Sequence, residues 1–323
     1  MTIRLGIIGA GWIAGLHLEA LERLGRTDLV GVVSRTIEGA TAITDGWGGS
    51  PFDDLDRMLD ATRLDAVYVC VPPFRAVAIG EQLVERRIPF LIEKPLAADD
   101  PAGPARLAAA IGKAGVLTAV GYHLRGLDFM PELRGRLAER PPRMIAARWL
   151  GETPPTAWWS RVDQGGGQVV EQATHLYDLA RLLMGEAEVV GAVSTRDTPA
   201  EAQERDVADA TVAVLRFATG AVGSFTSAHR LASSSIAIEL TSDGLLTTLH
   251  KEDGGQGDWH VSFDDGQEAV VRHAVRDPYE IQAAAFLDAL ESGRPDLVLS
   301  SYADALKTDR LTRAVVAATG QLG

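Results

Sequence analysis

Lys94 stands where an apolar run ends. The run Phe90–Ile92 predicts a buried strand, and Glu93, Lys94 and Pro95 follow it directly. A buried amine costs free energy unless another group pairs with it or uses it. A lysine in such a place can donate a hydrogen bond that polarises a reacting oxygen, or act as an acid if burial lowers its pKa. Strand alternation points Glu93 to the opposite side, which favours a structural over a catalytic role.

A second polar set lies in a predicted helix over residues 169–184. Glu171, His175 and Asp178 are spaced i, i+4 and i+7, which would place all three on one helix face. Such a stripe can hold an imidazole between two carboxylates and tune it for proton transfer. Two other interpretations stay open: a solvated helix face with an ordinary His–Asp pair, and a metal site. The chain has no second cluster of His or Cys, so we expect no metal.

The segment GAGWIAG, residues 9–15, predicts a dinucleotide site. Gly9, Gly11 and Ala14 satisfy the fingerprint G-x-G-x-x-A between a predicted strand and a predicted helix. The first glycine permits a tight turn, the second lets the backbone approach a pyrophosphate, and the small third residue lets the helix pack. The free N–H groups of the helix N-terminus would then bind the anion. A glycine-rich turn without a ligand is the alternative.

The end of the second predicted strand indicates which dinucleotide binds. An acidic residue there would bind the ribose 2′-hydroxyl of NAD, but Ser34, Arg35 and Thr36 follow LVGVV. A hydroxyl and a guanidinium suit a 2′-phosphate, so we expect NADP, with NAD still possible. In the alternative, Arg35 is a solvated surface residue and Ser34 caps the next helix.

Composition and charge indicate a globular protein of ordinary type. Hydrophobic residues make up 46% and charged residues 23% of 323 residues, enough chain for two domains. A net charge of −13 and a pI near 5.0 argue against nucleic acid or an anionic membrane as partner. The one cysteine, Cys70, is expected to be a packed small hydrophobe. We find no signal peptide and no apolar run of about 20 residues, so we expect a cytoplasmic protein.

The pattern of predicted elements changes near residue 121. Before it, apolar runs without alternation are separated by amphipathic stretches, which predicts a doubly wound parallel sheet in a domain of residues 1–121. After it, six strand candidates follow one another, with helices at 127–139, 169–184, 278–291 and 301–318. We therefore expect residues 122–323 to form an α+β domain with a large, mostly antiparallel open sheet.

Taken together, these motifs resemble the Gfo/Idh/MocA family, the relatives of glucose–fructose oxidoreductase and inositol dehydrogenase. The opening GIIGAGWIAGLHLEAL, the tripeptide Glu93-Lys94-Pro95 and the segment GGGQVVEQATHLYD match in order, and the resemblance covers nearly the whole chain. It implies a Rossmann domain followed by an open-sheet domain, with nicotinamide and substrate in a cleft between them. It also implies hydride transfer at a carbinol of a sugar, cyclitol or related polyol, and a Lys94–Pro95 bond in cis.

The resemblance assigns roles to particular residues. Lys94 matches the family's EKP lysine, His175 matches its acid/base histidine, and Glu171 stands where an aspartate is usual, one methylene shorter. We therefore expect these three to be catalytic. Expected cofactor contacts come from the strand ends and their loops: Gly9, Gly11, Trp12, Ile13, Ala14, Ser34, Arg35, Val71, Pro72, Glu93 and Lys94.

Expected substrate contacts are Asp178, His123, Arg125 and Trp158. For His123 and Arg125, which lie just past the last predicted strand of the first domain, ordinary hinge packing is the alternative. For Trp158 and its neighbour Trp159, the alternative to an apolar wall against a sugar ring is plain core.

Besides Glu171, two departures limit the transfer. Ala76 stands where many relatives have a histidine, and Val71-Pro72-Pro73 replaces their Thr-Pro-Asn turn.

Two rival functions share the resemblance. One is a nicotinamide-dependent glycosidase, which restores its cofactor in each turnover, and the other is a catalytically silent dinucleotide-binding sensor. A silent protein would be expected to lack Lys94 or His175, and both are present. A broad second-domain sheet would leave one face needing cover, so we expect a homodimer or homotetramer through it.

Overall fold

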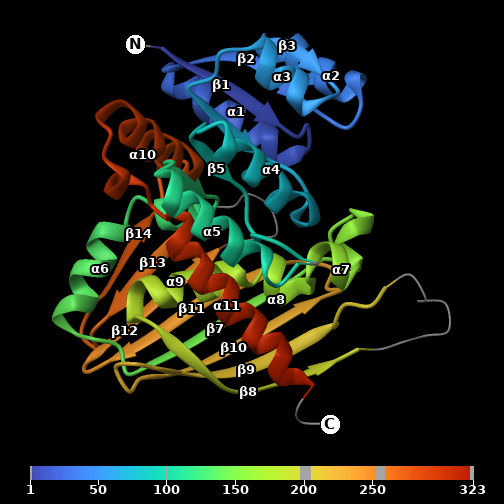
Figure 1. The fold of residues 1–323 in the computed structure, drawn as a ribbon. Helices are drawn as coiled ribbons and strands as arrows, with labels where there is room; N and C mark the ends of the chain where they lie inside the picture. Colours follow the sequence, from blue (N-terminus) through green and yellow to red (C-terminus); the bar gives the residue numbers. More distant parts are fainter. Residues whose placement is uncertain (1, 99, 197–204, 252–258, 321–323) are drawn as a thin grey trace. The chain divides into compact units, whose positions relative to one another are not determined.

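The structure is a computed structural model that describes residues 2–98, 100–196, 205–251 and 259–320. These residues form two compact units (Figure 1). The first unit contains the chain up to Gly126 and the segment Asp277–Leu306; the second contains Leu127–Arg276 and the chain from Lys307. No helix in the described part of the chain is long and apolar enough to cross a membrane.

A six-stranded parallel sheet forms the centre of the first unit, in the order β3-β2-β1-β4-β5-β6. All residues of β4, β5 and β6 are buried, as expected for apolar runs without alternation. The order reverses between β1 and β4, and open α/β sheets bind ligands beyond the carboxyl ends of strands at such a point. The strands are β1 (Ile3–Ile8), β2 (Thr27–Val33), β3 (Ser50–Phe52), β4 (Ala66–Val69), β5 (Phe90–Ile92) and β6 (Thr118–Val120).

Helices bury both faces of this sheet in two apolar cores. One core joins the sheet to α1 and α10, and the other joins it to α3, α4, α5 and the first turns of α11. The helical elements are α1 (Trp12–Leu24), α2 (Ile37–Trp47), α3 (Leu55–Ala61), α4 (Pro73–Glu85), α5 (Gly103–Ala114), η1 (His123–Gly126), α10 (Pro278–Ser292), η3 (Pro295–Leu297) and α11 (Tyr302–Thr319), which continues into the second unit.

The second unit is built on an eight-stranded sheet in the order β14-β13-β12-β11-β7-β10-β9-β8. Every neighbouring pair is antiparallel except β7 and β10, so the expected large, mostly antiparallel sheet is confirmed, as is the doubly wound sheet of the first unit. The strands are β7 (Met144–Gly151), β8 (Ala187–Thr195), β9 (Ala210–Phe217), β10 (Val222–His229), β11 (Ser235–Ser242), β12 (Leu245–Lys251), β13 (Trp259–Asp264) and β14 (Ala269–His273).

One face of the second sheet is buried and the other is exposed. Along β9, buried and less buried residues alternate through the whole strand. Helices α8 and α9 lie on the buried face (Figure 1), where Tyr177 of α9 stacks on Phe225 of β10 with ring centroids 4.6 Å apart. The helical elements are α6 (Met130–Glu139), η2 (Ala157–Ser160), α7 (Val162–Gly165), α8 (Gly167–Glu171), α9 (Thr174–Met184) and the part of α11 from Lys307.

The prediction of one helix over residues 169–184 is wrong in one respect, because the structure has two helices in this segment. Helix α8 ends at Glu171 and α9 begins at Thr174. Between them the N–H of Ala173 bonds to the carbonyl of Gln168, five residues back, which interrupts the i to i−4 pattern. Glu171 therefore lies in a different helix from His175 and Asp178.

The sequence patterns did not predict β3, β12 or β14 as strands. The turn Asp243-Gly244 between β11 and β12 was a usable signal, since Ser242 pairs with Leu245 across a two-residue hairpin turn and Gly244 has φ +66°. The sequence of β12, LLTTLHK, alternates only imperfectly, and this hid the strand.

The division of the chain also differs from a single boundary after residue 121. Segment 277–306, expected in the second domain, groups with the first unit. Phe286 and Leu287 of α10 explain this, because both are buried in the same core as Leu18 of α1.

Candidate active site

The loop after β1 is shaped for close backbone approach. Gly9 has φ +105°, and a Cβ there would overlap the carbonyl oxygen of Cys70 at the end of β4, so only glycine fits. Gly11 is the N-cap of α1 and makes no side-chain cap, and a Cβ on it would meet no heavy atom within 4 Å. Ala14 is fully buried behind them. No side chain thus blocks the approach of a ligand at Gly11, and the first N–H groups of a helix are the ones that can bind an anion.

The remaining residues expected at this loop lie at the carboxyl ends of β1 and β4. The side chain of Trp12 is 71% exposed, and Ile13 packs half-buried against the core. Pro72 is the N-cap of α4, and Val71 lies directly before it, 3.4 Å from the position of an added Gly9 Cβ. Burial raises the pKa of the Cys70 thiol well above its usual value, and the charge of Glu93 adds to the rise. The thiol therefore stays protonated in the core, as expected for packing rather than chemistry.

The end of β2 presents a hydroxyl and a free guanidinium. The Oγ of Ser34 lies 2.7 Å from the position that a Cβ on Gly39 would take. Because Gly39 has no side chain, the Ser34 hydroxyl fits at the start of α2. Thr36, not Ser34, caps this helix by accepting a hydrogen bond from Gly39 N at 3.2 Å. Arg35 is exposed and pairs with no carboxylate of the described residues. Both side chains are thus available to a ligand.

Lys94 sits directly beyond β5, half-buried, and its bond to Pro95 is cis as expected. The preceding Glu93 is buried and holds the turn: its Oε2 accepts a hydrogen bond from the Lys94 backbone N–H at 3.2 Å. Its Oε1 lies 2.7 Å from Nε2 of His17 in α1. A Cβ on Gly121, just after β6, would overlap this carboxylate.

His17 is a residue that the sequence reasoning missed. It is fully buried, and it lies on the helix stripe formed by Ala14, Leu18 and Leu21. A histidine inside an apolar stripe is itself a signal, because a buried polar group requires a partner. The partner, Glu93, is 76 residues away and could not be identified from spacing.

Segment η1 is tied to the returning segment of the first unit. The ring of His123 stacks on Tyr279 of α10, with centroids 4.4 Å apart. Arg125 is buried and donates to the carbonyl of Leu299 at 2.9 Å and to Oδ2 of Asp304 at 2.6 Å. These contacts show that Arg125 joins η1 to residues 299 and 304 of the first unit. The substrate contacts expected from His123 and Arg125 stay predictions.

His175 and Asp178 lie together on α9 in the second unit. His175 is buried, and its ring stacks on Trp149 of β7 at 5.7 Å between centroids. Asp178 is buried and accepts a hydrogen bond from Oγ1 of Thr308 at 3.1 Å. The same Oγ1 accepts one from Arg181 Nη1 at 2.7 Å. A rigid polar network thus supports the helix turn that carries His175.

The surroundings of Glu171 include the second of the two tandem tryptophans. Trp159 donates from Nε1 to Oε2 of Glu171 at 2.9 Å, and its ring meets His229 edge-on at 4.8 Å between centroids. With only 1% of its surface exposed, Trp159 is core, which was one of the two interpretations left open. Trp158 is half-buried in η2 and stays a candidate substrate contact. Glu171 is anchored by Trp159, a partner that the stripe interpretation did not include.

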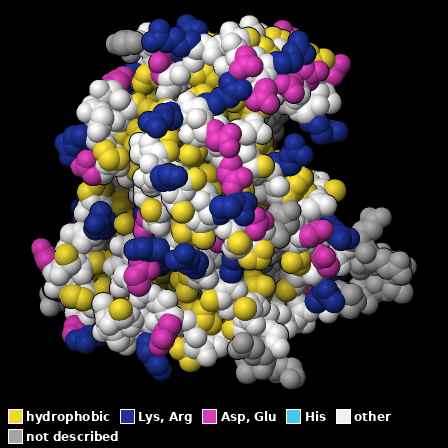
Figure 2. Space-filling model, in the orientation of Figure 1, with side chains coloured by type: hydrophobic (Ala, Val, Ile, Leu, Met, Phe, Trp, Pro, Cys, Tyr) yellow, Lys and Arg dark blue, Asp and Glu magenta, His cyan; other side chains and the backbone are white. Residues whose placement is uncertain are grey.

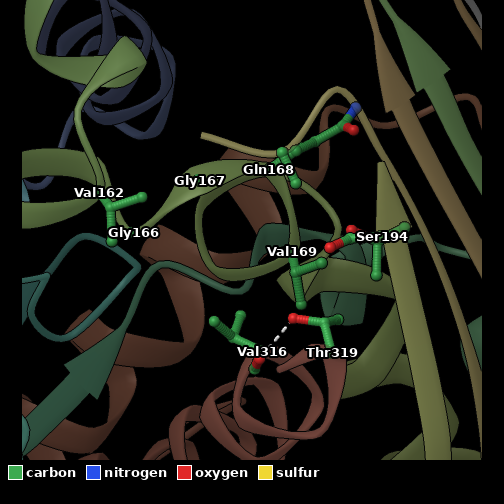
Figure 3. A pocket seen from close by; sticks show the side chains of 10 residues that line it. Val162, Gly166, Gly167, Gln168, Val169, Ser194, Val316 and Thr319 are labelled. Carbon is green, nitrogen blue, oxygen red and sulfur yellow. Dashed lines mark hydrogen bonds between the residues drawn. The ribbon is translucent and has the colours of Figure 1, made fainter. Parts of the chain in front are cut away.

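A small pocket lies beside residues 162–169 within the second unit. Figure 3 shows Val162 and the segment 166–169 facing Ser194 of β8 and the end of α11, where Thr319 donates to the carbonyl of Val316. Its volume of about 60 Å³ is too small for a sugar ring or a nucleotide, since ligand pockets usually measure about 300–1,000 Å³. The segment 166–169 is therefore packed against its neighbours at this pocket rather than open to a ligand.

The described residues contain no group of three or more His, Cys, Asp or Glu placed to hold a metal ion. On the face drawn in Figure 2, Lys and Arg side chains are interspersed with Asp and Glu rather than gathered into one basic field. This charge distribution differs from the clustered basic surface that binds nucleic acid.

Comparison with known protein families gives two matches, one within each of the two units. The sequence model of an oxidoreductase family with an NAD-binding Rossmann fold, Gfo/Idh/MocA, matches residues 3–122. The model of the Gfo/Idh/MocA C-terminal domain matches residues 141–244. The two matches together cover more than half of the chain.

Several curated proteins are similar in sequence. A dTDP-3,4-didehydro-2,6-dideoxy-alpha-D-glucose 3-reductase of Actinomadura kijaniata is 29% identical over 64% of this chain and 62% of its own length. An inositol 2-dehydrogenase of Rhizobium meliloti is 27% identical over 58% of this chain and 57% of its own length. A myo-inositol 2-dehydrogenase of Thermotoga maritima is 23% identical over 92% and 90%.

Two solved structures share the fold over the whole chain. A 3-ketoreductase from Actinomadura kijaniata in complex with NADP and TDP-benzene has a TM-score of 0.85 at 24% identity, covering 98% of both chains. A UDP-N-acetylglucosamine 3-dehydrogenase from Acidithiobacillus ferrooxidans has a TM-score of 0.82 at 22% identity, covering 100% of both.

Proposed function

Because the chain belongs to the Gfo/Idh/MocA family of oxidoreductases, we propose that it is an NADP-dependent enzyme acting on a CH–OH group of a sugar, cyclitol or related polyol. The observation that carries the proposal lies within the first unit. The glycine loop after β1 and Lys94 after β5 stand at the carboxyl edge of one parallel sheet, with only β4 between their strands. An anion-binding loop beside a positioned amine suits a nicotinamide enzyme.

The residues present fit a dinucleotide. The open helix end at Gly11 and the left-handed turn at Gly9 would hold the pyrophosphate, with Trp12, Ile13 and Ala14 forming the start of the helix behind it. The turn Val71-Pro72 borders the same space at the end of β4. Ser34 and Arg35 would hold the 2′-phosphate, which distinguishes NADP from NAD.

Arg35→Ala is expected to weaken NADP binding about 10- to 100-fold, because a charge-assisted hydrogen bond to phosphate is lost. NAD binding should stay nearly unchanged, since NAD lacks that phosphate. Fluorescence titration of both cofactors measures the two affinities. Arg57→Ala is the matched control, because Arg57 is 76% exposed on α3 and pairs with Asp53. Tighter binding of NAD than of NADP by the wild type would contradict the proposal.

The proposed chemistry divides between residues of the two units. When bound, the nicotinamide exchanges a hydride with the reacting carbon of the substrate. His175 takes the hydroxyl proton during oxidation and returns it during reduction, a task that suits an imidazole with a reference pKa of about 6.5. Lys94 donates a hydrogen bond to the reacting oxygen, which stabilises the negative charge that develops there. Both roles are those that the family resemblance assigns to these residues.

The other proposed site residues act on the substrate or on the catalytic histidine. Glu171, which accepts a hydrogen bond from Trp159, would orient His175 or bind a substrate hydroxyl. Asp178, which lies on α9 with His175, would also orient His175 or bind a substrate hydroxyl. His123, Arg125 and Trp158 would contact the substrate.

An assay with a panel of sugars and cyclitols tests the function. We expect net formation or consumption of NADPH, read by absorbance, in step with conversion of one panel member. Sugar release without a net change in NADPH would instead identify a nicotinamide-dependent glycosidase. NADP binding without conversion of any panel member would favour the silent sensor.

We also propose a cytoplasmic homodimer or homotetramer formed through the exposed face of the second sheet. Val193 and Val212 pair across β8 and β9 on that face, and Val214 lies two residues along; each is at least 44% exposed. Exposed apolar patches of this kind mark contact surfaces.

Light scattering after size exclusion should give the molar mass of a dimer or tetramer. The double variant Val212→Asp, Val214→Asp should have the molar mass of a monomer. Val275→Asp is the control, because this valine is 86% exposed outside the strands. A monomeric wild type would refute the proposed assembly.

A further inference from the structure

The buried pair of His17 and Glu93 has no place in the chemistry described so far. Both side chains are buried, at 0% and 6% exposure, and Nε2 lies 2.7 Å from Oε1. Burying an imidazole and a carboxylate is costly unless each group has a hydrogen-bonding partner, and here each is a partner of the other.

The geometry favours a proton on Nε2 of His17. Nδ1 of His17 is buried and has no hydrogen-bond partner among the described residues. An imidazolium would therefore leave one N–H without an acceptor, whereas the neutral ring with its proton on Nε2 donates to Glu93 and leaves only a lone pair unused.

The carboxylate is held on three sides. His17 donates to Oε1, the backbone N–H of Lys94 donates to Oε2, and the missing Cβ of Gly121 leaves the space that the carboxylate occupies. Because the Lys94 N–H is one of these contacts, the position of the Lys94 backbone depends directly on where Glu93 is held.

Helix α10 extends this network to the other expected substrate segment of the first unit. The ring of Tyr279 meets His17 edge-on, with centroids 5.3 Å apart, and stacks on His123 at 4.4 Å. Tyr68 of β4 closes the remaining side of His17, edge-on at 5.1 Å. The turn that carries Lys94 and the segment that carries His123 are thus linked by one chain of ring contacts, buried at His17 and Tyr68 and half-buried at Tyr279 and His123.

We propose that His17 and Glu93 are positioning residues that hold the backbone of Lys94 and so aim its ammonium group at the reacting oxygen. This inference rests on the proposed function, in which Lys94 acts on that oxygen. It assigns Glu93 a task behind the turn, in place of the direct cofactor contact that the sequence suggested. A displacement of about 1 Å at a catalytic group can lower turnover about 100-fold, so the pair would affect kcat without touching the substrate.

The test compares substitutions of His17 that differ in hydrogen bonding. In His17→Gln the amide nitrogen can reach Glu93 as a donor, whereas His17→Asn is one methylene shorter and His17→Leu has no donor. We expect the His17→Leu and His17→Asn variants to have a kcat about 10- to 100-fold lower, the usual loss when a group that orients a functional residue is removed. Gln should retain most of the activity, and the NADP affinity and KM should change little in all three.

Tyr68→Phe is the matched control, because it alters the same chain of ring contacts without touching Glu93. It should leave kcat near the wild-type value. Wild-type kcat in His17→Asn, or an equal loss in the Gln and Asn variants, would overturn the positioning role. If His17→Leu does not fold, the comparison of Gln with Asn still decides the matter.

A readout independent of activity separates this inference from the proposed function. Hydrogen exchange of the Lys94 amide, followed by NMR, should be slow in the wild type and in His17→Gln and at least about tenfold faster in His17→Asn. Equal exchange in the wild type and His17→Asn would overturn the inference even if the enzyme proves active. Absence of turnover with every substrate tested would defeat the proposed function, and the exchange measurement would still test the pair.

Discussion

Lys94→Ala is expected to lower kcat about 100- to 10,000-fold, the range found when a positioned proton donor or charge-stabilising group is removed. The ammonium group would contact the reacting oxygen, and alanine leaves no donor there. NADP affinity should stay nearly unchanged, because the pyrophosphate would bind at Gly9 and Gly11 on a different loop. Steady-state kinetics and a cofactor titration measure the two effects separately.

Lys94→Arg should recover little of this loss, since a guanidinium differs from an ammonium in size, geometry and donor directions. Lys113→Ala supplies a control, because that lysine lies in the last turn of α5. Wild-type turnover in Lys94→Ala would remove Lys94 from the mechanism. An equal loss of NADP affinity and turnover would instead make it a cofactor-binding residue only.

His175→Ala is expected to lower kcat by a similar factor, about 100- to 10,000-fold, because the proton of the substrate hydroxyl loses its acceptor. The pH profile should change as well. In the wild type, oxidation requires the neutral imidazole, so kcat/KM should rise as pH increases through the pKa of the histidine and then level off. In the variant, this inflection should be absent.

Two further observations would separate catalysis from packing in the His175→Ala variant. The ring of His175 stacks on Trp149, so loss of the ring removes contacts as well as the proton acceptor. His175→Gln retains bulk but cannot serve as a base, and it should be as slow as the alanine variant. An unchanged pH inflection in either variant would show that another group carries the proton.

Much of the fold follows from local sequence patterns. The apolar run before Gly9 and the periodic segment from Trp12 gave β1 and α1 because strand and helix periodicities are unambiguous there. The turn at Lys94 was identified for the same reason: a short apolar strand ended by charge and proline has few alternatives.

What the sequence could not give depends on distant contacts. The pairing of His17 with Glu93 and the return of α10 to the first unit join residues far apart in the chain, and neither leaves a local pattern. The break after Glu171 was hidden because VVEQATHLYDLA keeps a helical hydrophobic period through the interruption. The period therefore predicted one helix carrying both Glu171 and His175, which lie in α8 and α9.

Deuterium transfer tests the central claim most directly. The panel member that gives turnover is deuterated at its CH–OH carbons, incubated with NADP and the enzyme, and the reduced cofactor is analysed by mass spectrometry. Direct hydride transfer predicts that each NADPH formed carries one deuterium, in amounts equal to the oxidised product. Reduced cofactor without deuterium, or cleaved substrate with no net reduced cofactor, would contradict the assignment of this protein as a polyol or sugar oxidoreductase.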